Sequence, residues 1–279
     1  MTPASLVSIA GETTTTPFSH RGFAMNPRVR SWKGARVWVI GASTGIGAAT
    51  ASLLLSKGAH VALSARNATA LKNLARNHAH AIALPVDITQ LADLKSAHSS
   101  LLAQWGHIDI VLIVAGIYNE MRADTLDMKQ INDVLDINLR GVFHCLDVVM
   151  PDLLKQQHGG IGIVSSVAGY SGLPKALAYG PTKAALINLC ESLYFDLSRR
   201  GHAIYLINPG FVKTPATANN DFKMPGLISA EEAAREILSG MERGQFHIHF
   251  PKGFTNWLRF ARLLPYRWYF HLIHKVTGL

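Results

Sequence analysis

Cysteine and long apolar runs are both scarce in this chain of 279 residues, and each shortage excludes a class of protein. The two cysteines, Cys145 and Cys190, lie in apolar helical patterns without a C-x-x-C spacing. This favours reduced core residues in a reducing compartment over a disulfide or a cysteine metal site. No uncharged apolar stretch reaches the length of a membrane-spanning helix. The first 20 residues lack a secretory pattern, so we expect a cytoplasmic protein.

Acidic residues are almost absent from the two ends of the chain. Residues 1–36 carry five Lys/Arg and one acid, and residues 243–279 carry six Lys/Arg and no acid. Between them, 16 basic residues are balanced by 17 acidic ones, so the net charge of +9 belongs to the ends. This distribution argues against a nucleic-acid-binding core and favours terminal segments that meet an anionic surface.

Apolar strand-like runs alternate with helical patterns through the middle of the chain. This alternation predicts one α/β domain over residues 33–250, with a doubly wound parallel seven-stranded sheet of the Rossmann type. Residues 1–32 show no clear periodicity and are expected to form a disordered or loosely packed extension. Strands are predicted at 36–40, 60–65, 81–86, 108–114, 160–165, 202–207 and 245–250, and helices at 48–57, 68–78, 90–105, 127–156, 178–199 and 230–242.

A glycine-rich turn separates the first strand from the first helix, in the order Gly41-Ala-Ser-Thr-Gly45-Ile-Gly47. Gly41 permits a tight exit from the strand. Gly45 and Gly47 let phosphates approach the helix N-terminus, whose free N–H groups favour anions. A turn that is merely structural is the alternative.

The end of the second strand indicates which dinucleotide would bind. An NAD site usually places an acid there for the ribose 2′-hydroxyl, whereas this stretch contains Arg66 and no acid. A guanidinium suits the 2′-phosphate of NADP. We therefore expect NADP(H) to be preferred and NAD(H) to be the alternative, which applies if Arg66 is only a solvated loop charge.

Tyr179 and Lys183 are four residues apart in a predicted helix, one turn apart on the same face. Ser166 follows a buried strand and would face this pair. An ammonium near a phenol favours the phenolate and is expected to lower the pKa of Tyr179 toward neutrality. The serine would hydrogen-bond a substrate oxygen. An exposed helical pair without function is the alternative.

Taken together, these motifs resemble the classical short-chain dehydrogenases/reductases over roughly residues 34–250. The resemblance implies that Tyr179 exchanges a proton with the substrate oxygen, Ser166 polarises that oxygen, Lys183 assists Tyr179 and binds the nicotinamide ribose, and Asn138 holds a relay water. It also implies a set of residues that contact the cofactor: Gly41, Ser43, Thr44, Gly45, Ile46, Gly47, Arg66, Asp87, Ala115, Gly116, Tyr179, Lys183, Pro209, Gly210, Val212 and Thr214.

The chain departs from the family pattern after the fourth strand. The family's Asn-Asn-Ala-Gly reads Ile113-Val-Ala-Gly116 here, which removes an asparagine that links neighbouring strands. We expect an effect on local rigidity more than on catalysis.

The expected activity is NADP(H)-dependent hydride transfer between nicotinamide and a carbonyl or alcohol, with reduction of an apolar, lipid-like ketone or aldehyde favoured. Oxidation of a hydroxysteroid-like alcohol, or an idle dinucleotide-binding sensor or scaffold, is the alternative. The family also implies a homodimer or homotetramer paired through the helices at 127–156 and 178–199. Residues 215–228 have the composition of a substrate lid or of a surface loop.

The C-terminal segment, residues 251–279, combines helical apolar spacing with basic and aromatic residues. Pro265 divides it into two amphipathic helices. Such a segment suits a peripheral membrane contact, and packing on the domain or on a second subunit is the alternative. His247 and His249 alternate on the last strand. No cysteine or acid completes a metal site around them, so no metal is expected, and we interpret them as one polar face of the strand.

Overall fold

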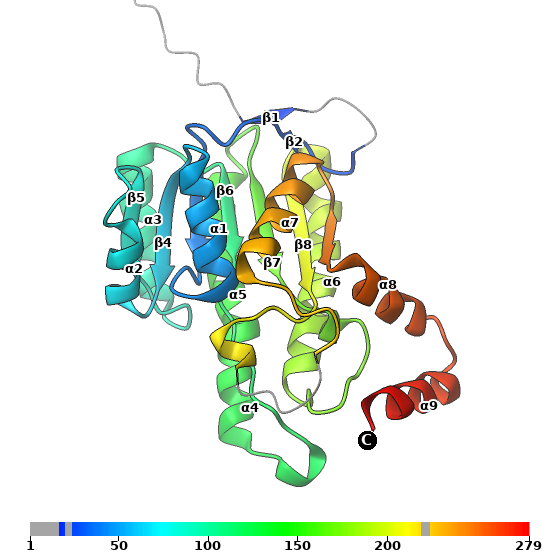
Figure 1. The fold of residues 1–279 in the computed structure, drawn as a ribbon. Helices are drawn as coiled ribbons and strands as arrows, with labels where there is room; N and C mark the ends of the chain where they lie inside the picture. Colours follow the sequence, from blue (N-terminus) through cyan, green and yellow to red (C-terminus); the bar gives the residue numbers. More distant parts are fainter. Residues whose placement is uncertain (1–16, 20–23, 219–223, 279) are drawn as a thin grey trace, which may run out of the picture.

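The computed structural model describes all residues except 1–16, 20–23, 219–223 and 279. A seven-stranded parallel sheet forms its centre, with the strand order β5-β4-β3-β6-β7-β8-β9 (Figure 1). The order reverses between β3 and β6, which is where such folds bind ligands. The predicted Rossmann-type fold is confirmed. The strands are β3 Arg36–Ile40, β4 His60–Ala65, β5 Ala81–Pro85, β6 Ile110–Ile113, β7 Gly160–Val164, β8 Ala203–Pro209 and β9 His247–Phe250.

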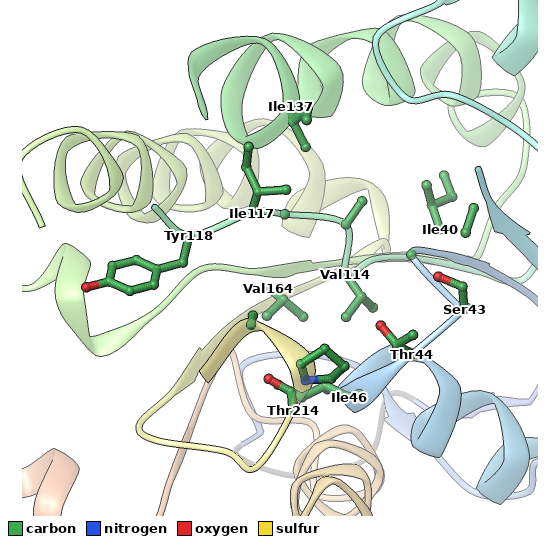
Figure 2. Close-up of a pocket in the computed structure, with 18 of the residues that line it drawn as sticks. Ile40, Ser43, Thr44, Ile46, Val114, Ile117, Tyr118, Ile137, Val164 and Thr214 are labelled. Carbon is green, nitrogen blue, oxygen red and sulfur yellow. The ribbon is translucent and has the colours of Figure 1, made fainter. Parts of the chain in front are cut away.

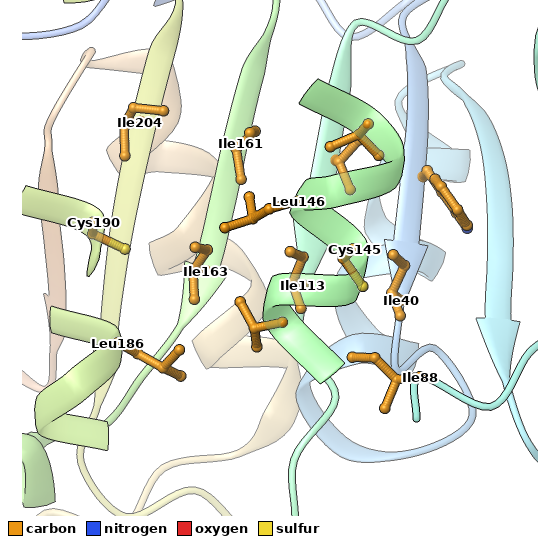
Figure 3. Close-up of a cluster of buried hydrophobic side chains, with 14 of the residues drawn as sticks. Ile40, Ile88, Ile113, Cys145, Leu146, Ile161, Ile163, Leu186, Cys190 and Ile204 are labelled. Carbon is orange, nitrogen blue, oxygen red and sulfur yellow. The ribbon is translucent and has the colours of Figure 1, made fainter. Parts of the chain in front are cut away.

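Helices cover both faces of the sheet and bury two apolar layers. One layer contains Leu54 and Ile237, and the other contains Leu186 and the two cysteines (Figure 3). Cys145 and Cys190 are buried free thiols, as expected. The covering helices are α1 Gly45–Ser56, α2 Ala68–Ala75, α3 Leu91–Trp105, α4 Met128–Leu135, α5 Gly141–Leu153, α6 Tyr179–Leu197 and α7 Ala230–Glu242.

The helix predicted over 127–156 is interrupted by a π-helical turn, Asp136–Arg140. The N–H of Gly141 donates to the carbonyl of Asp136, five residues back, so the helix widens between α4 and α5. This widening places Asn138 fully in the core. Periodicity alone does not reveal such a turn, because the apolar pattern continues through it.

The N-terminal extension packs on the domain from residue 24 onward, so the expectation of a disordered segment reaching residue 32 is wrong there. Asn26 donates from Nδ2 to the carbonyls of Ile204 at 2.7 Å and Gln245 at 3.0 Å, and its Oδ1 accepts from the Ile204 N–H. Trp32 is buried and donates to Glu242. The short strands β1 Phe18–Ser19 and β2 Arg28–Val29 pair antiparallel. The rest of the predicted extension lies outside the described residues.

Two helices follow β9 and extend away from the sheet, α8 Lys252–Ala261 and α9 Tyr266–Thr277 (Figure 1). Their inner faces pack, because Leu258 and Tyr269 are buried and the Tyr269 hydroxyl donates to the Gly172 carbonyl at 2.7 Å. Among the described residues, no helix combines the length and hydropathy needed to span a bilayer. Large apolar side chains remain exposed on the outer faces: Phe260, Leu263, Tyr266, Trp268, Phe270 and Val276.

His247 and His249 share one face of β9 as predicted, but that face is covered rather than solvated. The Tyr170 hydroxyl contacts His247 Nε2 at 2.9 Å. His249 is buried between Thr255 at 2.7 Å and the Arg259 guanidinium at 3.1 Å, which fastens α8 to the sheet. Burial, as the largest cause, lowers the pKa of His247 to about 3 and the pKa of His249 to about 4.

Candidate active site

A cavity of about 490 Å³ opens at the carboxyl ends of the strands, where the sheet order reverses. Figure 2 shows side chains from the β3–α1 turn, the segment after β6 and the chain after β8 gathered around it. The cavity brings together most of the predicted residues: Gly41, Ser43, Thr44, Gly45, Ile46, Gly47, Arg66, Asp87, Ala115, Gly116, Ser166, Tyr179, Lys183, Pro209, Val212 and Thr214.

The glycine turn leaves room that side chains would fill. Gly41 has φ +101°, and a Cβ there would lie 2.4 Å from the Ala115 nitrogen. A Cβ on Gly47 would lie 2.0 Å from the Gly41 carbonyl oxygen. Thr44 caps α1 without a side-chain hydrogen bond, so no side-chain cap occupies the first N–H groups of the helix. This cradle fits a pyrophosphate.

The opposite end of the cavity carries the charges that bear on the nucleotide. Arg66 is exposed. Both Arg66 and Asp87 line this cavity and also an adjoining one. Asp87 Oδ1 accepts from the N–H and the hydroxyl of Thr89, at 2.9 and 2.8 Å. Asp87 is the one carboxylate in the described lining of the main cavity. The residues present therefore fit the adenosine end of a dinucleotide.

Ser166, Tyr179 and Lys183 meet at the inner end of the cavity. Ser166 follows β7 and caps a short 3₁₀ turn, and its side chain hydrogen-bonds Tyr179. Tyr179 opens α6, with Lys183 one turn later. The Lys183 ammonium donates to the Val164 carbonyl at 2.9 Å and lies 5.5 Å from the centre of the Tyr179 ring.

The electrostatics of Tyr179 differ from the expectation. Burial raises the pKa of Tyr179 to about 12, while the hydrogen bond from Ser166 acts in the opposite direction. Lys183 is 3% exposed, and burial lowers its pKa to about 8. The expected lowering of the Tyr179 pKa is thus wrong for this structure, because burial outweighs the hydrogen bond from Ser166 and the neighbouring Tyr118 acts in the same direction as burial. Tyr179 is a protonated phenol at neutral pH.

Asn138 lies behind the cavity rather than in its lining. Its Oδ1 accepts from the Ile117 N–H at 2.8 Å, and its Nδ2 donates to the Ile117 carbonyl at 2.9 Å. It also contacts Thr182 at 3.4 Å, whose hydroxyl donates to the Tyr179 carbonyl. Asn138 therefore connects the segment after β6 to the first turn of α6.

Gly210 also lies outside the cavity lining, although its neighbours Pro209 and Val212 line it. Its N–H donates to the Phe250 carbonyl at 2.7 Å, and a Cβ there would meet the Phe254 ring at 3.0 Å. Gly210 serves the close packing of β8, β9 and α8. Thr214 returns to the site and lies against Gly45.

Sequence reasoning missed several side chains that line the cavity. Tyr118 packs edge-on against Tyr179, with ring centres 5.2 Å apart. Most of the other missed residues are apolar, and the full set is Ile40, Ala65, Asn67, Val86, Ile88, Val114, Ile117, Ile137, Val164, Ser165, Pro215, Ala216 and Thr217. Tyr118 could have been found from its place two residues after Gly116, but the contact itself depends on the tertiary fold.

The altered stretch Ile113–Gly116 keeps the strands connected through the backbone. The N–H groups of Val114 and Ala115 both donate to the Ile40 carbonyl, at 2.7 and 2.9 Å. Val114 lines the cavity with its side chain.

Comparison with known proteins decides the family. Residues 35–224 match the family model described as short chain dehydrogenase. The chain belongs to the short-chain dehydrogenase family. It is therefore an oxidoreductase acting on alcohol or carbonyl groups, in a family that binds NAD(P)(H).

Relatives of this short-chain dehydrogenase span nearly its whole domain. An uncharacterized oxidoreductase of Myxococcus xanthus is 33% identical over 233 residues, covering 81% of this chain and 91% of that one. The 3-oxoacyl-[acyl-carrier-protein] reductase FabG of Salmonella typhimurium is 31% identical over 207 residues, covering 74% and 85%. A short-chain dehydrogenase structure from Streptomyces avermitilis superposes with a TM-score of 0.74 at 21% identity, covering 88% and 98% of the two chains, which supports the fold alone.

Proposed function

We propose that this enzyme uses NADPH to reduce a ketone or aldehyde on an apolar substrate. The observation that carries the proposal is the meeting of Ser166, Tyr179 and Lys183 in a cavity whose far end presents Arg66 without an acid at the end of β4. The nicotinamide, when bound, supplies the hydride. The apolar part of the lining, which includes Val114, Ile117 and Val164, favours an apolar substrate.

The chain's own residues then handle the substrate oxygen. The Ser166 hydroxyl donates a hydrogen bond to the carbonyl oxygen as negative charge develops there. Tyr179, protonated at neutral pH, delivers its proton to that oxygen. The Lys183 ammonium stabilises the phenolate left behind, and Asn138 holds the first turn of α6 in position.

Tyr179→Phe tests the chemistry. We expect turnover to fall by about 10²–10⁴-fold while NADPH binds as before, because the ring stays and the proton is lost. The first carbonyl substrates to assay are 3-oxoacyl thioesters, because one relative is named a 3-oxoacyl-[acyl-carrier-protein] reductase. Full activity in the mutant would overturn the mechanism. Cofactor binding without turnover on any carbonyl or alcohol would favour the sensor or scaffold instead.

Arg66→Ala tests the cofactor preference. An exposed guanidinium beside a phosphate contributes roughly tenfold or more in affinity. We expect the mutant to lose affinity for NADPH and to keep its affinity for NADH. Arg76→Ala is the matched control, because Arg76 is an exposed arginine at the other end of α2 that does not line the cavity. NADH binding as tightly as NADPH in the wild type would favour alcohol oxidation.

We also propose that α8 and α9 rest on an anionic membrane surface. Tyr266 and Trp268 are 80% and 66% exposed, and no acid interrupts the basic residues from 243 onward. Aromatic and basic side chains together favour a bilayer interface. Trp268→Ala and Arg267→Ala should weaken sedimentation with phosphatidylglycerol vesicles, and neutral vesicles should bind weakly. Equal binding to both vesicle types, or to neither, would contradict this.

Oligomerisation through α5 and α6 is the third part of the proposal. Phe143 and Phe195 are exposed on these helices, and burial in a homodimer or homotetramer would remove them from water. Phe195→Glu should yield a monomer by size-exclusion chromatography with light scattering. A monomeric wild type would refute this assignment.

A further inference from the structure

Histidines gather at the amino ends of the sheet strands, on the edge opposite to the cavity. His60 begins β4, while His107, His158 and His202 lie just before β6, β7 and β8. Ring nitrogens of His107 and His158 and a carboxylate oxygen of Asp109 lie within 4.8 Å of one another. We propose that these three side chains bind a first-row divalent metal ion of the Zn²⁺ class.

The spacing of the candidate ligand atoms suits a tetrahedral ion. Asp109 Oδ1 lies 3.3 Å from His107 Nε2 and 3.4 Å from His158 Nε2. Ligands about 2.0–2.1 Å from a tetrahedral Zn²⁺ are separated from each other by about 3.3 Å. Two of the ligand-to-ligand edges therefore already have the required length. A fourth position would be left for water.

Asp109 supplies the second, independent observation. Its residue is 3% exposed, and among the described residues the side-chain neighbours of Oδ1 are the imidazole nitrogens of His107 and His158, at 3.3 and 3.4 Å, neither of which meets it in close hydrogen-bond geometry. The other oxygen, Oδ2, accepts from the Arg36 backbone N–H at 2.8 Å, which fixes the carboxylate with Oδ1 toward the two imidazoles. A buried carboxylate oxygen that is held only by such long contacts is poorly satisfied, and a metal ion placed between the three groups would satisfy it.

The positive charge of Arg36 lies close to the proposed site and disfavours the binding of a cation there. Its guanidinium nitrogen lies 2.7 Å from Nδ1 and 3.0 Å from Nε2 of His107. An atom that close to both ring nitrogens must lie over the ring face, because an in-plane position would overlap the carbon between them. The in-plane lone pair of Nε2 is therefore not directed at Arg36. The positive charge still lowers the affinity of the site.

The site is accessible, and it is distant from the chemistry. The side chains of His107 and His158 are each 26% exposed, so an ion can enter from solvent. The Phe18 ring packs edge-on against His158 with ring centres 6.4 Å apart, next to the N-terminal arm. A bound ion would tie together the segments that enter β6 and β7. Its effect should be on stability rather than on turnover.

The experiment uses full-length protein without a histidine tag, stripped with EDTA and titrated with Co²⁺ and then Zn²⁺. We expect one equivalent of Co²⁺ with the visible spectrum of a tetrahedral site, displaced by Zn²⁺. Zn²⁺ should raise the unfolding temperature by several degrees without changing turnover. His107→Gln and His158→Gln should each weaken Co²⁺ binding at least tenfold. These partly exposed histidines are the variants of choice, since Asp109 is buried.

Two further variants provide the controls. His60→Gln removes a ring from a neighbouring histidine pair, whose ring centres lie 4.4 Å apart, and should leave binding unchanged because that pair has no carboxylate. Arg36→Met keeps the backbone donor but removes the charge, and should tighten binding roughly tenfold. Absence of saturable binding, or full affinity in the His107→Gln/His158→Gln double variant, would overturn the proposal.

Discussion

Protonation of His249 is the perturbation that tests how α8 is held on β9. The ring is 6% exposed and lies between the Thr255 hydroxyl and the Arg259 guanidinium. Because Arg259 only donates, His249 Nε2 must accept and Nδ1 must carry the proton, which describes a neutral ring. Burial, followed by the charges of Lys252 and Arg259, lowers the pKa of His249 to about 4. In an unfolded chain its pKa is about 6.5.

The sign follows from proton counting. Between these pKa values the unfolded chain holds a proton that the folded chain does not, so stability falls as the pH falls from 6.5 toward 4. Above pH 7 this group contributes no pH dependence. A single histidine with this shift lowers the free energy of unfolding by about 1 kcal/mol between pH 7 and pH 5.5, and by about 3 kcal/mol by pH 4. His247, whose ring centre lies 4.7 Å away, shifts in the same direction.

Urea unfolding of wild type and His249→Gln at pH 7, 6, 5.5 and 5 measures this effect. The variant should be less stable at pH 7, and its deficit should shrink by about 1 kcal/mol at pH 5.5, because it no longer carries the penalty for protonation. His60, His98, His107 and His202 also have lowered pKa values, so only the difference between the two curves isolates His249. Parallel curves for His249→Gln would refute the reasoning.

Three further changes test the fold and the cofactor cradle. Asn26→Ala removes three side-chain hydrogen bonds that hold the N-terminal arm, and urea unfolding should show a loss of about 3 kcal/mol; a loss below about 1 kcal/mol would mean that the arm is held elsewhere. Gly47→Ala places a Cβ 2.0 Å from the Gly41 oxygen, so NADPH quenching of protein fluorescence should disappear; unchanged affinity would contradict the cradle. Ser229→Ala removes the capping box of α7 and should cost about 1 kcal/mol in thermal unfolding, with Ser56→Ala as the exposed control.

Local sequence patterns predicted the strands and turns of this protein whose conformation depends on neighbouring residues. Continuous apolar runs located all seven strands of the central sheet, and the break at Pro265 separated α8 from α9. The spacing of Gly41, Gly45 and Gly47 placed the turn after β3 correctly, because the conformation of such a turn depends on residues that are close together in the sequence. Boundaries moved by a few residues where strands lengthen along their neighbours, as at β8.

Contacts between distant parts of the chain were not predictable in the same way. Asn26 is paired with Ile204, 178 residues away, and nothing in the sequence around Asn26 marks that partner. The π-helical turn at Asn138 follows an unbroken apolar pattern. The pKa of Tyr179 depends on burial beneath Tyr118, which sequence spacing does not show. His107 and His158 belong to different loops and meet only because β6 and β7 are neighbours.

The hydrogen bond from Tyr269 to the Gly172 carbonyl has a practical consequence for protein engineering. Gly172 lies on the loop between Ser166 and Tyr179, so the last helix of the chain fastens the segment that joins two residues of the candidate catalytic group. A fusion partner or affinity tag at the carboxyl end would therefore be attached to the helix that holds this loop.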